Sequence, residues 1–115
     1  LDISLGRDKG VSVQRVKRKD LSTRQLLGSR RVESVGWTIT VRNNKDQPIA
    51  LTITDHYPVL VRNEIVVRLD EDGGAIVDAE KGFLTWRMEL QPRADRSLPF
   101  GYSVKVPKER QVVLE

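Results

Sequence analysis

Apolar and polar side chains alternate along most of this chain, and the alternation is clearest over residues 35–53. Every odd position from Val35 to Val41 is apolar, and the same spacing resumes after the polar residues 43–48. Because successive side chains of a β-strand point to opposite faces, this spacing predicts two strands that each bury one face. The polar residues between them end in a proline and are typical of a turn. The pattern therefore predicts a β-hairpin over residues 35–53.

The same alternation predicts further short strands on both sides of this hairpin. Two of them, Ile3–Leu5 and Val11–Val13, flank a turn that ends near Gly10. After residue 58, where a proline favours a bend, alternation returns in runs at 65–69, 75–77, 84–90 and 98–106. Turns rich in glycine, aspartate and proline separate these runs, as expected between antiparallel strands.

Only residues 21–28 carry a helical signal. Ser22 and Gln25 have the spacing of a capping box, and Gly28 is suited to a helix end, which predicts a single helical turn. So short a helix needs packing to persist. The whole pattern, with about seven strands, predicts one all-β domain over residues 1–115, an antiparallel immunoglobulin-like β-sandwich. Parallel strands would need crossover helices that this chain has no room for.

Two sheets are expected because an alternating chain cannot leave its apolar faces in water, and they should lie about 10 Å apart. The side chains that we expect in the core share the inward parity of their strands: Trp37, Ile39, Val41, Leu51, Ile53, Val67, Trp86, Leu90, Phe100 and Tyr102. Two further aromatic residues, Tyr57 and Phe83, fall outside the strand patterns. We expect these two to offer a small exposed aromatic contact.

Composition excludes several kinds of site. The 115 residues include no cysteine, which excludes disulfides, thiolate metal sites and a cysteine nucleophile. A single histidine excludes a zinc site with several histidine ligands from one chain. No apolar run approaches the roughly 20 residues of a membrane-spanning helix. Since the chain begins without methionine, we expect it to be a piece of a longer protein.

The positive charge of the chain is concentrated in one segment. The formal net charge is +4, but residues 7–31 alone carry nine basic and two acidic side chains. Residues 32–115 carry eleven basic and thirteen acidic side chains, and Asp2 supplies the remaining negative charge. Any binding of polyanions should therefore be argued from the basic segment, not from the whole surface.

The basic segment, residues 14–31, is expected to form a strand end and a loop. Its candidate binding side chains, for a nucleic acid or an acidic polysaccharide, are Arg15, Lys17, Arg18, Lys19, Arg24, Arg30 and Arg31. Residues 7–31 contain no aromatic side chain, although grooves that bind nucleic acids usually include aromatics for stacking. We therefore favour a solvated edge whose long charged side chains discourage aggregation, and nucleic acid as a partner is not expected.

The acidic turn Asp70–Gly74 suggests calcium but lacks the spacing of an EF-hand. If Asp70 is the first position, Gly74 and Lys81 fall at the fifth and twelfth positions, where oxygen ligands belong. Asp78 and Glu80 remain possible ligands across a hairpin. We favour a solvated turn without a metal ion.

The only histidine has an acidic neighbour, but the pair does not suggest a serine triad. His56 follows Asp55 directly, and adjacent residues of an extended strand point to opposite faces. We expect Asp55 to accept backbone N–H bonds at the bend before Pro58. A hydrolase with paired carboxylates stays open, because only the separation of carboxylates in space would identify it.

The order of several motifs resembles the C-terminal domain of mucoidy-inhibitor-A-like proteins. The motifs are Leu5-Gly6, Trp37–Pro48, Thr54–Pro58, Gly82–Trp86, Leu90–Pro92 and Tyr102–Pro107, and together they cover nearly the whole chain. Each is common in β-sandwiches, so the resemblance rests on their succession. It implies an antiparallel sandwich preceded by an N-terminal domain and a coiled coil, both missing from this sequence. It implies no catalytic residues, and it suggests a periplasmic or cell-surface location.

These observations favour a non-enzymatic module of a larger envelope or surface-associated protein. We expect it to act in protein–protein contact or as a structural spacer, without a cofactor, beside other domains of the same protein or a protein partner. Strand pairing at an exposed sheet edge would supply the contact. Two alternatives stay open: a binding module for anionic polymers that uses the basic segment, and a hydrolase with an unrecognised carboxylate site.

Overall fold

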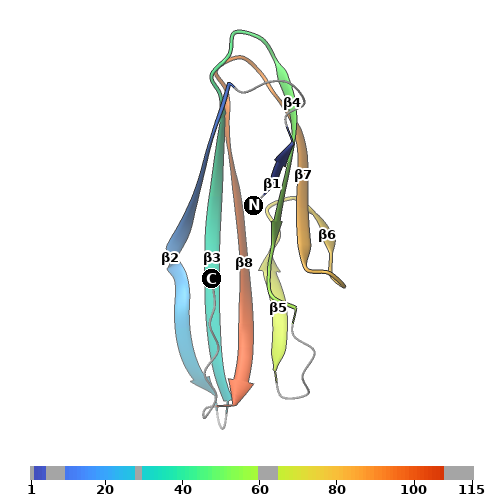
Figure 1. Ribbon diagram of the computed structural model, residues 1–115. Coiled ribbons are helices and arrows are strands. Elements are labelled where there is room, and N and C mark those ends of the chain that lie inside the picture. Colours follow the sequence, from blue (N-terminus) through green and yellow to red (C-terminus); the bar gives the residue numbers. More distant parts are fainter. Residues whose placement is uncertain (1, 5–9, 28–29, 60–64, 108–115) are drawn as a thin grey trace.

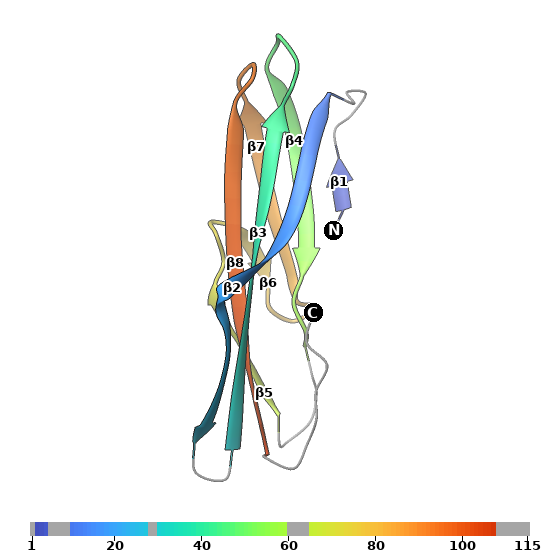
Figure 2. The same cartoon turned by 90° about the vertical axis from the view of Figure 1, so that its left-hand side faces the viewer.

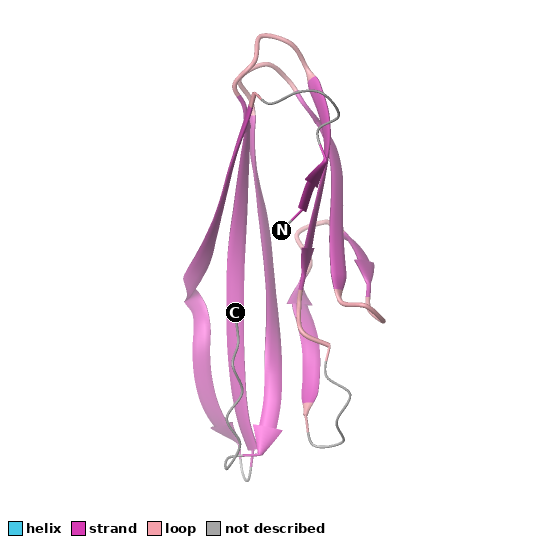
Figure 3. Cartoon of the chain, in the orientation of Figure 1, coloured by secondary structure: helices cyan, strands magenta, loops and turns pink. Residues whose placement is uncertain are grey.

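The computed structural model describes residues 2–4, 10–27, 30–59 and 65–107, and it contains eight strands and no helix in these ranges (Figure 3). The strands are β1 (Asp2–Ser4), β2 (Val11–Leu27), β3 (Arg30–Asn43), β4 (Ile49–His56), β5 (Val66–Glu71), β6 (Ile76–Asp78), β7 (Phe83–Leu90) and β8 (Asp95–Pro107). Side chains are not described in β1, at residues 19–31, or at 106 and 107. The expected all-β class is confirmed.

The strands form two antiparallel sheets of four. Sheet A has the order β1-β4-β7-β6, and sheet B has the order β2-β3-β8-β5. In Figure 1 the long strands β2, β3 and β8 stand on the left and β4 and β7 on the right; Figure 2 shows the same layers from the side. This arrangement confirms the predicted antiparallel β-sandwich.

The predicted hairpin over residues 35–53 is wrong. Its two strands exist, but β3 pairs with β2 and β8, whereas β4 pairs with β1 and β7 in the other sheet. The turn at 44–48 is therefore an arch that carries the chain from sheet B to sheet A. Five extended residues span at most about 17 Å, enough to cross the roughly 10 Å between packed sheets.

The predicted helical turn over residues 21–28 is also wrong, because residues 21–27 continue β2. Thr23 pairs with Ser34 and Leu27 pairs with Arg30, so the β3 backbone supplies the hydrogen bonds that one helical turn would have made. The register shifts between Arg18 and Thr23, where β2 bulges away from β3. The basic segment thus lies mostly in strands, and its positions 28 and 29 fall outside the described residues.

The core lies between the sheets and is filled by the inward-facing side chains of both. Of the residues expected there, eight are buried: Ile39, Val41, Leu51, Ile53, Trp86, Leu90, Phe100 and Tyr102. Trp37 and Val67 are half-buried and pack against this core. The rings of Trp86 and Phe100 lie 5.9 Å apart between centroids, tilted by 49°. The two tryptophans are therefore not equivalent, since only Trp86 is in the centre.

No helix in the described ranges has the length and apolar character that crossing a membrane requires. At the sheet ends, β2 and β5 each have one neighbour in sheet B, and β1 and β6 each have one neighbour in sheet A. β2 is by far the longest of these four edge strands, with 17 residues.

Candidate functional site

Of the seven basic candidate residues, three have side chains that the structure describes, and they behave differently. Arg15, Lys17 and Arg18 lie in the part of β2 that pairs with residues 36–43. The backbones of the other four are in strands, but their side chains are outside the described residues: Lys19, Arg24, Arg30 and Arg31. The contacts of the predicted polyanion site are therefore known only for the first three side chains.

Arg15 points between the sheets. Its Nε donates to Oδ2 of Asp55 on β4 at 2.8 Å, and the Asp55 side chain has no exposed surface. The guanidinium carbon lies 3.8 Å from the centroid of the Trp37 ring, a cation–π arrangement. Arg15 thus joins sheet B to sheet A and covers Trp37, so most of its charge is directed inward and not toward a polymer in solution.

Arg18 extends over the outer face of sheet B. Its Nη1 donates to Oε1 of Glu71 on β5 at 2.8 Å, although β2 and β5 are the two opposite edges of the sheet. Gly36 and Gly101 are paired between them in the same row, and neither has a Cβ that would obstruct the path. Arg18 therefore links both edges of sheet B.

The remaining described cation of this segment, Lys17, is exposed. It shares the inward parity of Arg15, but it lies at the sheet edge, and its strand neighbour Val16 is 50% exposed on the outer face. Charged side chains on an edge strand and a bulge beside them both oppose uncontrolled pairing with other edges. Among the described basic side chains of this segment, Arg15 and Arg18 are paired with carboxylates and Lys17 is exposed at the edge of sheet B.

The backbone of β2 provides the most extended unpaired edge among the described strands. Residues 11–18 form a regular ladder with β3, and residues 19–22 separate it from a second ladder that begins at Thr23. Val11 and Val13 are half-buried against the core at the start of this ladder. Along residues 11–18, one side of β2 therefore has no neighbouring strand among the described residues.

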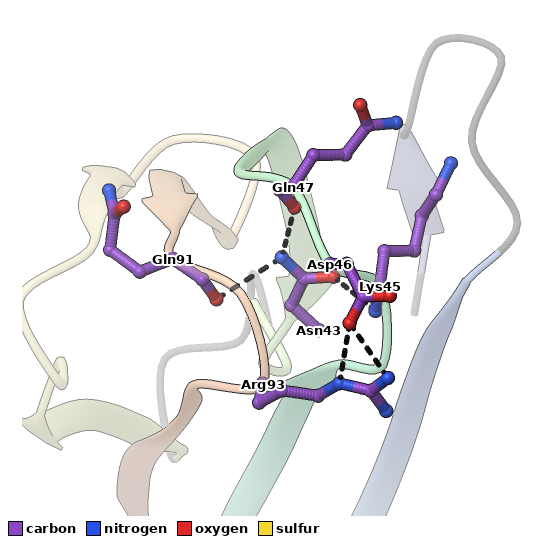
Figure 4. Close-up of polar contacts among 6 residues, drawn as sticks. All are labelled: Asn43, Lys45, Asp46, Gln47, Gln91 and Arg93. Atoms are coloured by element: carbon purple, nitrogen blue, oxygen red, sulfur yellow. Dashed lines mark hydrogen bonds and ion pairs between the residues drawn. The ribbon is translucent and has the colours of Figure 1, made fainter.

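Sequence reasoning missed Asn43, which has no exposed surface and joins two loops at one end of the sandwich (Figure 4). Its Nδ2 donates to the carbonyl oxygens of Gln47, Leu90 and Gln91 at 2.9, 3.0 and 3.1 Å. Its Oδ1 accepts from the Lys45 amide at 2.9 Å. The asparagine within a polar turn was visible in the sequence, but its partners across the fold were not.

A second link joins the same two loops at the surface. Arg93 adopts a left-handed backbone conformation with φ of 63°, and its Nε and Nη2 donate to Oδ1 of Asp46 at 3.2 and 2.8 Å. Both side chains are largely exposed, so this pair contributes little to stability compared with the buried amide of Asn43. The Asn43 amide therefore contributes more than the Arg93–Asp46 pair to holding these two loops together.

Asp55 is buried near the end of β4, and its neighbour His56 is exposed. Asp55 lies within β4, opposite Leu84, and not in the expected turn. Its Oδ1 accepts from the backbone N–H of His56 at 2.8 Å, as expected of its carboxylate, while Oδ2 is bound by Arg15. The His56 ring is exposed and its Nδ1 lies 3.6 Å from Oδ1. The Asp55 carboxylate is therefore already committed to structural partners.

The acidic turns bind their own backbone. Asp72 Oδ1 accepts from the Gly74 N–H at 2.9 Å, and Asp78 Oδ1 accepts from the Lys81 N–H at 3.2 Å. Asp70 accepts from Arg68 Nε at 2.7 Å and from the Ser103 hydroxyl. Within the described residues, no three acidic or histidine side chains are grouped as a metal site would need.

The two aromatic residues expected at the surface differ. Phe83 is 43% exposed, on the outer face of sheet A, although it begins β7 and does not lie outside the strands. Tyr57 is buried, so the expectation of its exposure is wrong. Its N–H donates to the Gly82 carbonyl at 2.9 Å, which draws the chain after β4 onto the β6–β7 turn.

An open groove of about 380 Å³ lies beside the other edge of sheet B. Half-buried Val67 and Leu69 of β5 form one wall, and Tyr57 and Val77 contribute to the opposite wall. β6 has only three residues, so sheet A covers this corner of the core incompletely. The groove is mostly apolar, and its lining includes no carboxylate.

Comparison with known families identifies the chain over almost its full length. A family model described as Domain of unknown function (DUF4139) matches residues 3–108. Neither the curated proteins nor the solved structures gave a match. The chain belongs to the DUF4139 family of domains of unknown function.

Proposed function

We propose that this domain is a non-enzymatic protein-contact module of a larger protein and that it pairs with an extended polypeptide through β2. The observation that carries the proposal is the free edge of β2 over residues 11–18. An edge strand presents a row of unpaired N–H and C=O groups, and a second chain satisfies them when it adds as a further strand.

The side chains of β2 favour this contact over the binding of an anionic polymer. Arg15 and Arg18 have carboxylate partners at 2.8 Å within the domain, so a polymer would compete with Asp55 and Glu71 for them. Backbone pairing needs neither guanidinium to be released. Binding of an anionic polymer through the other basic side chains remains the alternative, and its signature is a steep loss of affinity with salt.

We propose that the domain is not catalytic because several of its acidic side chains are already bound within the domain. Asp55 is bound by Arg15, and the turn acids Asp72 and Asp78 accept backbone N–H groups. We base the proposed placement in an envelope or surface-associated protein, in the periplasm or at the cell surface, on the resemblance of the motif order to mucoidy-inhibitor-A-like proteins. In a spacer, by contrast, the β2 edge would have no partner.

Site-specific cross-linking in the full-length protein tests the proposal. A photoreactive amino acid replaces Gln14, which is exposed on β2, and a matched variant carries it at Glu89, exposed on the outer face of sheet A. We expect one identified polypeptide to be cross-linked at Gln14 and not at Glu89, and to bind the domain again when purified. Equal labelling at both positions, or none at Gln14, would contradict the proposal and favour a spacer.

A further inference from the structure

The kind of segment that fits the β2 edge follows from the charges and apolar residues along it, and this inference rests on the proposed function. Residues 11–18 of β2 carry three basic side chains and no acidic one, a net charge of +3. Arg15 and Arg18 are neutralised by Asp55 and Glu71, which leaves a net charge of +1, at Lys17, for a neighbouring strand. A second copy of residues 11–18 contains no acidic residue and therefore offers no carboxylate to Lys17.

The length of the partner segment is set by the bulge. Residues 11–18 pair in register with β3, but four β2 residues, 19–22, then intervene before Thr23 pairs with Ser34. A bulge bends its strand and increases the local twist, so a partner strand that follows residues 11–18 cannot continue regularly beyond them. The straight part of the edge accommodates about eight residues.

The two halves of this eight-residue edge differ in chemistry. Val11 and Val13 point inward and are half-buried, so apolar side chains of a neighbouring strand would extend the core there. At the other half, Lys17 is exposed and carries the positive charge that remains when Arg15 and Arg18 are paired with Asp55 and Glu71. Carboxylates fit beside this half.

We propose that residues 11–18 of β2 accept an extended segment of about eight residues with an apolar half beside Val11 and Val13 and an acidic half beside Lys17. Backbone hydrogen bonds hold the segment to the edge, and its carboxylates set the register. A neutral or basic strand lacks the second contribution. The proposed partner is thus a polypeptide with one short strand that is acidic in one half and apolar in the other. Negative charge alone, as in an anionic polymer, is not sufficient for this contact.

Titration of the 115-residue chain with designed octapeptides tests the inference, with amide chemical shifts and hydrogen exchange of residues 11–18 as readouts. One peptide has four glutamates followed by Thr-Val-Thr-Val for antiparallel pairing, and a second has the reverse sequence for parallel pairing. Controls replace each glutamate with lysine or methylate every backbone amide. We expect one glutamate peptide to bind at least tenfold more tightly than both controls and to slow exchange in β2.

Two substitutions locate the contact. Lys17→Glu should weaken binding of the glutamate peptide several-fold, whereas Lys81→Glu, the same charge change in the exposed turn before β7, should leave it within twofold. Both variants are first compared with the parent chain by thermal unfolding. Equal weakening by both would show a general effect of net charge and would overturn the proposed register.

The remaining outcomes show whether this inference fails alone or together with the proposed function. If the lysine peptide binds β2 as well as the glutamate peptide, the acidic partner is wrong but pairing at the edge stands. If the methylated peptide binds equally, the interaction is adsorption of an anionic polymer, and both proposals fail. Shifts confined to residues outside 11–18 also overturn both.

Discussion

Removal of the Asn43 amide should destabilise the domain more than any other single polar substitution at its loop end. The side chain has no exposed surface and makes four hydrogen bonds, of which the one to the Leu90 carbonyl is fully buried. Leaving that carbonyl unpaired costs about 1–3 kcal/mol. The three partly buried bonds contribute about 0.5 kcal/mol each, since water replaces part of them. The expected loss for Asn43→Ala is about 3 kcal/mol, a large fraction of the roughly 5–15 kcal/mol that stabilises a domain.

Urea unfolding followed by tryptophan fluorescence measures this loss. With a slope of about 1.5 kcal/mol per molar urea, the midpoint should fall by about 2 M. Asn44→Ala is the matched control, because Asn44 is exposed. Among the described side chains, its amide donates only to the Ser12 hydroxyl. Its midpoint should move by less than about 0.5 M, since changes at exposed positions are usually small.

An isosteric variant separates the hydrogen bonds from the volume of the side chain. Asn43→Asp keeps the shape and the acceptor for the Lys45 amide but places a carboxylate where Nδ2 faces three carbonyl oxygens. We expect it to be at least as destabilising as the alanine variant, because the buried charge meets only acceptors there. If Asn43→Ala or Asn43→Asp shifted the midpoint no more than Asn44→Ala, the assigned role of this amide would be refuted.

Three further predictions follow from the core and its edges. Asp55→Ala removes the partner of a guanidinium that is three-quarters covered and should cost about 2–3 kcal/mol in unfolding free energy, below the value for a fully buried pair. Acrylamide should quench the fluorescence of Trp37 more strongly than that of Trp86, measured in variants with one tryptophan replaced by phenylalanine; equal quenching would contradict their different burial. Phe83→Ser should change the unfolding free energy by less than about 1 kcal/mol. Leu84→Ala, at the next residue, should cost about 2–5 kcal/mol, because Leu84 is buried. A larger effect at Phe83 would contradict the exposed position of its ring.

The alternation of apolar residues identified the inward face of the strands, although Trp37 and Val67 on that face are only half-buried and Tyr57, outside the pattern, is buried. The period of two identifies the inward face of a strand, and the free energy of burying an apolar face applies whichever strand lies next to it. Ile39, Leu51 and Phe100 are buried for that reason. The same reasoning gave the all-β class and the two-layer architecture.

Which strands pair was decided only by the tertiary structure. The inward-facing positions on both sides of residues 43–48 fit a hairpin within one sheet and equally an arch between two sheets, because both connections bury the same side chains. The amide of Asn43 stabilises the arch, because it binds the carbonyls of Leu90 and Gln91, which follow it by nearly fifty positions. Local turn chemistry contains no information about such distant acceptors.

For the same reason, the sequence could not predict which partners the basic side chains of residues 14–31 contact. The sequence determined the charge of residues 14–31, their extended tendency up to residue 19, and the absence of cysteine and of a second histidine. Only the folded chain brought Asp55 to Arg15 and Glu71 to Arg18, across 40 and 53 positions. Charges interact through space according to their separation and burial, so their partners follow from the packing of the sheets and not from their spacing along the chain.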